Sequence, residues 1–198
     1  MRRGLIGMTA LAIGLPAIPA TSQIVGNDGL EFLTALKEGE GSKAYAIAER
    51  NGTNILNQRG TDGDAPLHIV IRQRNGNWIG FLLAKGADPN VAGADGDTPL
   101  ILAARAGFTE GVVRLIGSRA DVNRDNKRGE SPLIVAVNQR QQQIVKFLLE
   151  SGADPDKPDF AAGYSAREYA KRDNRNPELL RLIETVKRPT PKVAGPSR

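Results

Sequence analysis

The sequence predicts an all-α repeat solenoid, in which helix–turn–helix units are stacked and joined by β-turns or hairpins. Three related segments recur at a spacing of 33 residues: GDAPLHIVI (63–71), GDTPLILAA (96–104) and GESPLIVAV (129–137). A second motif keeps the same spacing: KGADPN (85–90), SRADVN (118–123) and SGADPD (151–156). A fixed period of this length indicates units that each pack only against their neighbours, with apolar helices between the turns.

Each unit carries the residues of a tight turn that leads into a helix. A glycine permits the turn, and the proline three residues later suits the first helical position, where a missing N–H has no consequence. Thr98 and Ser131 precede this proline and are expected to cap the helix. Ala65 has no side-chain oxygen, so we expect its helix start to be weaker by about 1 kcal/mol. Arg119 stands where the other two units have a glycine that ends the second helix.

These motifs resemble the ankyrin repeat, a β-turn followed by two antiparallel helices, over residues 28–186. The resemblance implies five units: an N-terminal cap (28–58), three full repeats (60–92, 93–125 and 126–158) and a C-terminal cap (159–186). The last unit contains one inserted residue. There Ala166 replaces the proline and Arg167 the core leucine, as expected of a cap with a polar outer face.

The N-terminus predicts a cleavable signal peptide at residues 1–20. Arg2 and Arg3 precede the uncharged apolar run Leu5–Leu15, and small residues follow up to Ala20. We therefore expect a periplasmic or secreted protein. The alternative is a retained membrane anchor, although the run is shorter than the ~18–20 residues that a span needs.

The charge of the chain is concentrated at its ends. The formal net charge is +5, yet residues 1–20 carry two arginines without an acid, and 187–198 carries four basic residues without an acid. The remaining chain is almost neutral and shows no basic stripe, so we expect no nucleic-acid partner. The basic tail 187–198 is rich in proline and glycine, and it is expected to be disordered.

Few residues are available for catalysis or metal binding. The chain has no cysteine and one histidine, which excludes thiolate chemistry and disfavours a histidine-based metal site. Aspartates pair at 62–64 and 95–97, but a calcium loop needs several further oxygens at fixed spacing. We therefore expect no metal, no cofactor and no catalytic residue.

His68 has two possible roles. The resemblance places it at the histidine of the family's T-P-L-H motif, where the imidazole ties neighbouring turns together. Ala65 replaces the threonine of that motif, so we expect His68 to brace backbone groups instead. The alternative is a general base acting with Asp62 or Asp64.

The resemblance implies a non-catalytic protein-interaction module whose turn tips and first-helix ends line a concave face. The candidate contact residues are Thr61, Asp62, Asp64, Arg72, Gln73, Ala94, Asp95, Asp97, Arg105, Ala106, Lys127, Arg128, Glu130, Asn138 and Gln139. The first two tips are acidic and the third has both signs, which suggests a partner with basic and polar groups at one end. We expect a monomer with a protein partner and no stable membrane insertion. A membrane-tethered envelope protein with the same role is the alternative, and an enzyme is less favoured.

Overall fold

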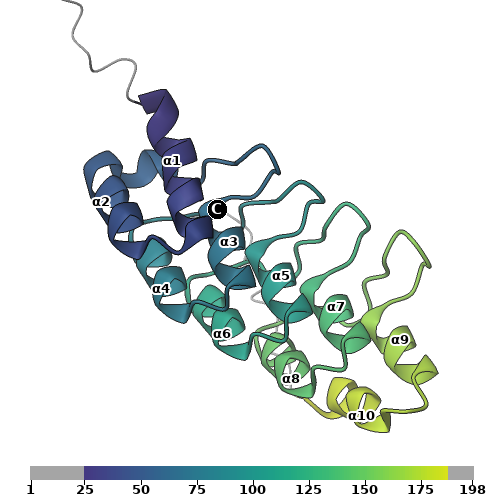
Figure 1. The fold of residues 1–198 in the computed structure, drawn as a ribbon. Helices are drawn as coiled ribbons and strands as arrows, with labels where there is room; N and C mark the ends of the chain where they lie inside the picture. The colour runs from purple at the N-terminus through teal and green to yellow at the C-terminus, as the bar shows by residue number, and fades with distance from the viewer. Residues whose placement is uncertain (1–24, 187–198) are drawn as a thin grey trace, which may run out of the picture.

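The computed structural model describes residues 25–186, drawn in colour in Figure 1. The predicted signal peptide and the predicted basic tail lie outside the described residues. Within them the helices are α1 Val25–Glu38, α2 Gly41–Asn51, η1 Gly52–Ile55 (a 3₁₀ helix), α3 Pro66–Arg72, α4 Gly76–Ala84, α5 Pro99–Arg105, α6 Thr109–Gly117, α7 Pro132–Asn138, α8 Gln142–Glu150, α9 Ala166–Arg172 and α10 Pro177–Thr185.

The helices form two rows that run along one axis (Figure 1). In the inner row α1, α3, α5, α7 and α9 pack each against the next, and α4, α6, α8 and α10 do the same in the outer row. The core lies between the rows, where Leu67, Leu100 and Leu133 of the repeated motif are fully buried. The predicted all-α repeat solenoid is therefore confirmed.

The starts of the inner helices follow the capping chemistry that the motif predicts. The hydroxyls of Thr98 and Ser131 each accept the amide N–H three residues later at 3.2 Å. Ala65 lacks such a cap, as expected, but its own amide N–H donates to Nδ1 of His68 at 3.1 Å. Ser165, which the motif comparison did not single out, caps α9 in the same way as Thr98. The imidazole thus satisfies the amide of the N-cap residue itself, a different donor from the one that the Thr98 and Ser131 hydroxyls accept.

The arginine that replaces a helix-ending glycine does not change the chain path. Arg119 adopts φ 63°, in the same left-handed region as Gly86 at 94° and Gly152 at 92°. A side chain in this region costs roughly 1–2 kcal/mol. The packing of the units on either side therefore imposes the turn on a residue that does not favour it.

Asparagines at the repeat spacing join the bases of successive units. Asn57, Asn90 and Asn123 each accept the amide N–H of an aspartate in the following unit, at 2.8, 2.7 and 2.8 Å. These bonds explain why the second motif contains a polar residue two positions after its aspartate. They fix one side of the stack, and the hairpins fix the other.

Candidate interaction surface

Hairpins project from one side of the stack, beside the inner helices (Figure 1). We call the hairpins at 60–64, 93–97, 126–130 and 159–164, together with the carboxyl-terminal ends of α3, α5, α7 and α9, the hairpin face. Each hairpin is closed by a backbone bond at its base, for example from the Gly93 amide to the Asp97 carbonyl at 2.9 Å. The last one closes from Asp159 to Tyr164 and so is one residue longer, where the inserted residue was inferred.

All the candidate contact residues lie on the hairpin face, but they differ in exposure. The exposed ones are Thr61, Asp62, Arg72, Gln73, Ala94, Asp95, Lys127, Arg128, Asn138 and Gln139. Arg105, Ala106 and Glu130 are half-buried, whereas Asp64 and Asp97 are buried. The two aspartates of each D-G-D turn therefore have different environments: the first is at the tip and the second points inward.

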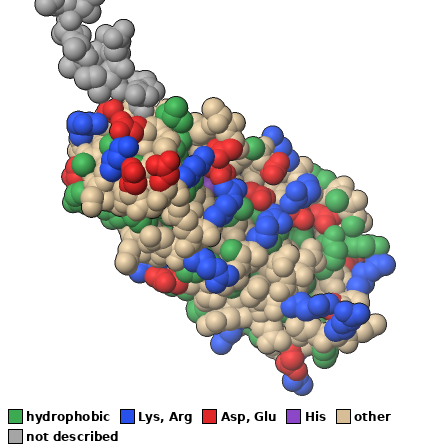
Figure 2. Space-filling model, in the orientation of Figure 1, with side chains coloured by type: hydrophobic (Ala, Val, Ile, Leu, Met, Phe, Trp, Pro, Cys, Tyr) green, Lys and Arg blue, Asp and Glu red, His purple; other side chains and the backbone are tan. Residues whose placement is uncertain are grey.

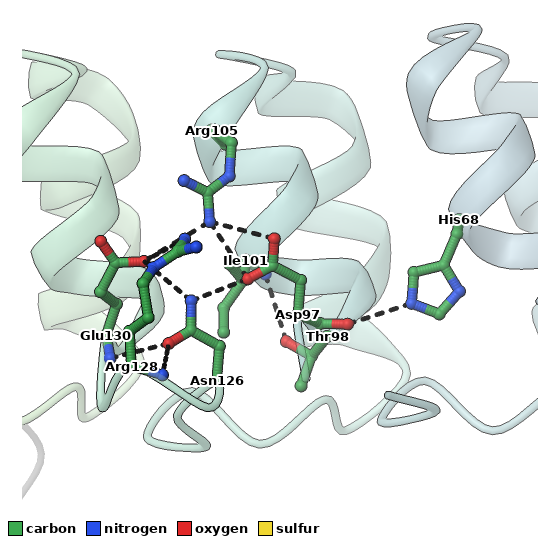
Figure 3. Close-up of polar contacts among 8 residues, drawn as sticks. All are labelled: His68, Asp97, Thr98, Ile101, Arg105, Asn126, Arg128 and Glu130. Atoms are coloured by element: carbon green, nitrogen blue, oxygen red, sulfur yellow. Dashed lines mark hydrogen bonds and ion pairs between the residues drawn. The ribbon is translucent and has the colours of Figure 1, made fainter. Parts of the chain in front are cut away.

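The buried aspartates each hold an arginine of the following helix. Asp64 forms an ion pair with Arg72, and Asp97 accepts from Nη2 of Arg105 at 3.1 and 3.0 Å. The Asp97 carboxylate also accepts a hydrogen bond from the side-chain amide of Asn126 at 2.8 Å (Figure 3). A carboxylate with this many donors is well satisfied inside the protein, and its function is to orient its arginine.

Asn126 connects this cluster to the next unit (Figure 3). Its Nδ2 donates to Glu130 at 2.8 Å, and the same Glu130 oxygen accepts from Nε and Nη2 of Arg128 at 3.0 and 2.7 Å. Burial alone raises the pKa of Glu130, but the hydrogen bonds from Arg128 and Asn126 outweigh it, so that its pKa lies below the usual value. The network joins the units 93–125 and 126–158, and its Glu130 stays charged at neutral pH.

The sequence contains a signal for this network that the motif search did not use. Asp64–Arg72 and Asp97–Arg105 share a spacing of eight residues, and Asn126 occupies the register of Gly60 and Gly93 in the earlier hairpins. An acid and an arginine repeated at one spacing are expected to pair if they share a face. Their burial was not evident, because it depends on the neighbouring hairpin.

His68 is the brace that its sequence position suggested. It is fully buried, its Nδ1 accepts the Ala65 amide, and its Nε2–H donates to the Asp97 carbonyl of the next unit at 3.1 Å (Figure 3). Both partners are backbone groups, as expected for a repeat without the motif's threonine. Because both ring nitrogens are occupied and Asp64 is paired with Arg72, nothing in this arrangement prepares the imidazole to act as a base.

The burial of His68 makes stability depend on pH. Desolvation lowers the pKa of the imidazole below 6.5, despite the backbone bonds from Asp97 and Ala65 that act in the opposite direction. The unfolded chain therefore binds this proton more readily, so stability is fully present above pH 6.5 and falls as the pH decreases below it. We expect urea denaturation to show that the free energy of unfolding falls more between pH 7.5 and pH 5.5 for the wild type than for His68→Gln. Equal losses would contradict this assignment.

The exposed charges change sign along the row of tips. Figure 2 shows acidic and basic side chains interspersed over the hairpins and the inner helices. Asp62 and Asp95 lie at the first two tips, and Lys127 and Arg128 at the third. Asp62 binds Lys37 at 2.6 Å, a contact that lowers the pKa of its carboxyl. The predicted contrast between acidic tips and a tip that bears basic groups is thus present on one surface.

The last tip adds an apolar group that sequence reasoning missed. Phe160 is 75% exposed, the most exposed of the large hydrophobic side chains in residues 28–186. Its amide donates to the Arg128 carbonyl at 2.9 Å, which places it next to the basic tip. Its position in the inserted segment DFAAG, outside the repeated motif, is why the motif comparison did not select it.

Two other kinds of site are absent from the described residues. Among residues 25–186 no group of three or more His, Cys, Asp or Glu side chains is placed to hold a metal ion. Nor is any helix there sufficiently long and apolar to cross a bilayer.

Comparison with known proteins agrees with the repeat assignment. A family model described as ankyrin repeats (3 copies) matches residues 24–126 and 67–159. No curated protein matches the chain. The family match covers well over half of the sequence and coincides with the stacked helix pairs and their hairpins. The chain belongs to the ankyrin-repeat family, whose repeats form protein-interaction modules.

Proposed function

We propose that this protein is a non-catalytic interaction module that binds one protein partner through the hairpin face. The observation that carries the proposal is the division of the candidate contact residues on this face. The buried Asp64 and Asp97 are each paired with an arginine of their own unit, while the exposed tips and helix ends present their side chains to a second molecule. Such a preformed surface loses little freedom on binding, so that many modest contacts add to a useful affinity.

The non-catalytic assignment is supported by the environment of the few reactive side chains. His68 is buried and bonded at both nitrogens, and the chain has no cysteine. The aspartates beside it bind Lys37 and Arg72. The pKa of Asp62 is lowered by Lys37, and carboxylates held by cations in this way suit a scaffold better than proton transfer near neutral pH.

The protein is proposed to act in the periplasm or outside the cell, as a monomer. The support is the signal-like sequence of residues 1–20, with its two arginines, apolar run and small residues. The competing possibility is an envelope protein tethered by an uncleaved N-terminus. Mass spectrometry of the exported protein distinguishes them, since cleavage is expected to leave Thr21 as the first residue.

An exchange of charges between neighbouring tips tests the binding face. Asp95→Lys combined with Lys127→Glu keeps the net charge and alters exposed side chains only, whereas reversing Arg105 would also break its pair with Asp97. We expect the immobilised double variant to capture at least about tenfold less of the partner from the native envelope fraction than the wild type does. A tenfold decrease corresponds to a loss of about 1.4 kcal/mol in binding free energy.

The matched control exchanges Lys146 and Glu150 on outer helix α8, which also keeps the net charge and the i,i+4 pair. Capture by this control should equal that of the wild type, and both variants should melt as the wild type does. If the tip variant captures the partner as well as the control, the proposed binding face is wrong.

A further inference from the structure

A cleft lies at the C-terminal end of the hairpin face, between α7 and α9. Its volume is about 290 Å³, and it is lined by Val137, Asn138, Arg140, Tyr169, Arg172 and Asp173. It lies at the C-terminal continuation of the register that contains the pairs Asp64–Arg72 and Asp97–Arg105. The residues at this register therefore show how the last unit differs from the earlier ones.

The arginine register continues into the last unit, but its acid does not. Allowing for the inserted residue, Arg172 corresponds to Arg72 and Arg105 at the end of the inner helix. The position of the buried Asp64 and Asp97 is taken by Tyr164. The carboxylate that neutralises each earlier arginine is thus replaced by an uncharged ring.

Tyr164 supports the guanidinium without neutralising it. The Arg172 Cζ atom lies 4.1 Å from the centroid of the Tyr164 ring, a cation–π geometry that leaves the edge of the guanidinium and its N–H groups available. Among residues 25–186 no carboxylate lies within ion-pair distance of Arg172, in contrast to Arg72 and Arg105. An exposed guanidinium without an acid in a cleft is a candidate anion site.

The Tyr164 ring is itself held in place by Tyr169 and Asp159. Tyr164 meets Tyr169 edge-on, with ring centroids 5.6 Å apart, and the Tyr169 hydroxyl donates to Asp159 at 2.6 Å. That hydrogen bond raises the pKa of Tyr169 to about 12, so the phenol keeps its proton. Asp159 also accepts the amides of Ala162 and Gly163 at 2.8 and 2.9 Å. This chain of contacts fixes the Arg172 guanidinium before a partner arrives.

The other charges of the cleft leave it positive. Arg140 donates to both oxygens of Asp173, at 2.6 and 3.0 Å, which neutralises that acid internally. Asn138 contributes a neutral amide at the register where Arg72 and Arg105 stand. Arg172 is consequently the unbalanced charge among the lining residues, since Glu168, one turn earlier on α9, lies outside the lining and accepts from Ser165. Asn138 adds an N–H donor from α7.

We propose that this cleft binds a carboxylate, an aspartate or glutamate side chain in the segment of the protein partner that lies over the C-terminal units. The proposal rests on the proposed function and adds the orientation of the partner segment along the hairpin face. Arg172 would present its two-pronged edge to the carboxylate, as arginine does best, with Asn138 as a further donor. The partner segment therefore carries acidic groups at this end and basic groups over Asp62 and Asp95.

A short acidic peptide tests the site directly. The probe is acetyl-(Gly-Glu)₃-amide, titrated into the ¹⁵N-labelled protein at low salt while the arginine Nε–H resonances are followed by NMR. We expect the Arg172 resonance to shift and saturate, with little change when acetyl-(Gly-Gln)₃-amide replaces it. Arg172→Gln should weaken peptide binding about tenfold, the loss expected for one charged hydrogen-bonded pair.

Arg181→Gln is the matched control, because Arg181 is an exposed arginine of the outer helix α10, away from the hairpin face, where it pairs with Glu178. It should leave peptide binding within twofold of the wild type, and Arg172→Lys should recover part of it. No shift at Arg172, or equal losses in the two glutamine variants, would overturn the proposal. A protein that still captures its partner through the tips yet fails this titration keeps the proposed function and loses only the carboxylate site.

Discussion

Replacing Asp97 by alanine is expected to lower the free energy of unfolding by about 3 kcal/mol, one of the largest losses from a polar substitution in this chain. The change removes the Asp97 acceptor from Arg105 and from the Asn126 amide, and leaves both groups to Glu130 alone in a half-buried setting. It also loosens the link from the second full repeat to the third, because Asn126 connects Asp97 to Glu130. Urea denaturation followed by circular dichroism measures the loss.

Asp95→Ala provides the control within the same D-G-D turn. Asp95 lies at the exposed tip, and its backbone carbonyl accepts a hydrogen bond from the Lys127 amide at 3.1 Å, which alanine retains. We expect a change within about 0.5 kcal/mol. If the two aspartates proved equally important for stability, the distinction between a buried acid and a contact tip would be wrong.

Gly96→Ala is expected to cost about 3 kcal/mol for a different reason. Gly96 has φ +79°, and a Cβ added there would lie 2.8 Å from the backbone nitrogen of Lys127 in the next hairpin. The substitution adds a left-handed backbone penalty to a clash with a main chain that cannot rotate away. The hairpins must separate locally, so hydrogen exchange of the Lys127 amide should accelerate as stability falls.

Gly163→Ala separates these two contributions. Gly163 has a similar φ, +70°, but a Cβ there would meet nothing within 4 Å. Only the backbone penalty remains, and we expect a loss of about 1 kcal/mol. Equal losses at the two glycines would show that the close approach of neighbouring hairpins adds nothing to stability.

The architecture could be predicted well from the sequence, because the same motifs recur in several units and each occurrence supports the same prediction. The two motifs at one spacing indicated the stack, and the residue before each proline indicated which helices have a hydroxyl cap. The backbone role of His68 followed from the absence of a threonine at Ala65, and both of its partners are indeed backbone groups.

The surface was harder to predict, because exposure depends on what the next hairpin covers. Asp62 and Asp64 look equivalent in sequence, yet the second turns inward and binds Arg72. The difference between Arg172 and the earlier arginines becomes visible only when the inserted residue has fixed Tyr164 in the register of the acids. The exposed Phe160 could not be predicted from the motifs, because it lies outside the repeated pattern.

Hydrogen–deuterium exchange with and without the captured partner tests the binding face most directly. Protection is expected at the hairpin tips around Asp95 and Lys127 and at the end of α9 around Arg172, where the proposed contacts lie. The outer helices α4, α6 and α8 should exchange at the same rate in both states. Protection confined to those outer helices, with unchanged hairpins, would contradict the assignment of the hairpin face as the interaction surface.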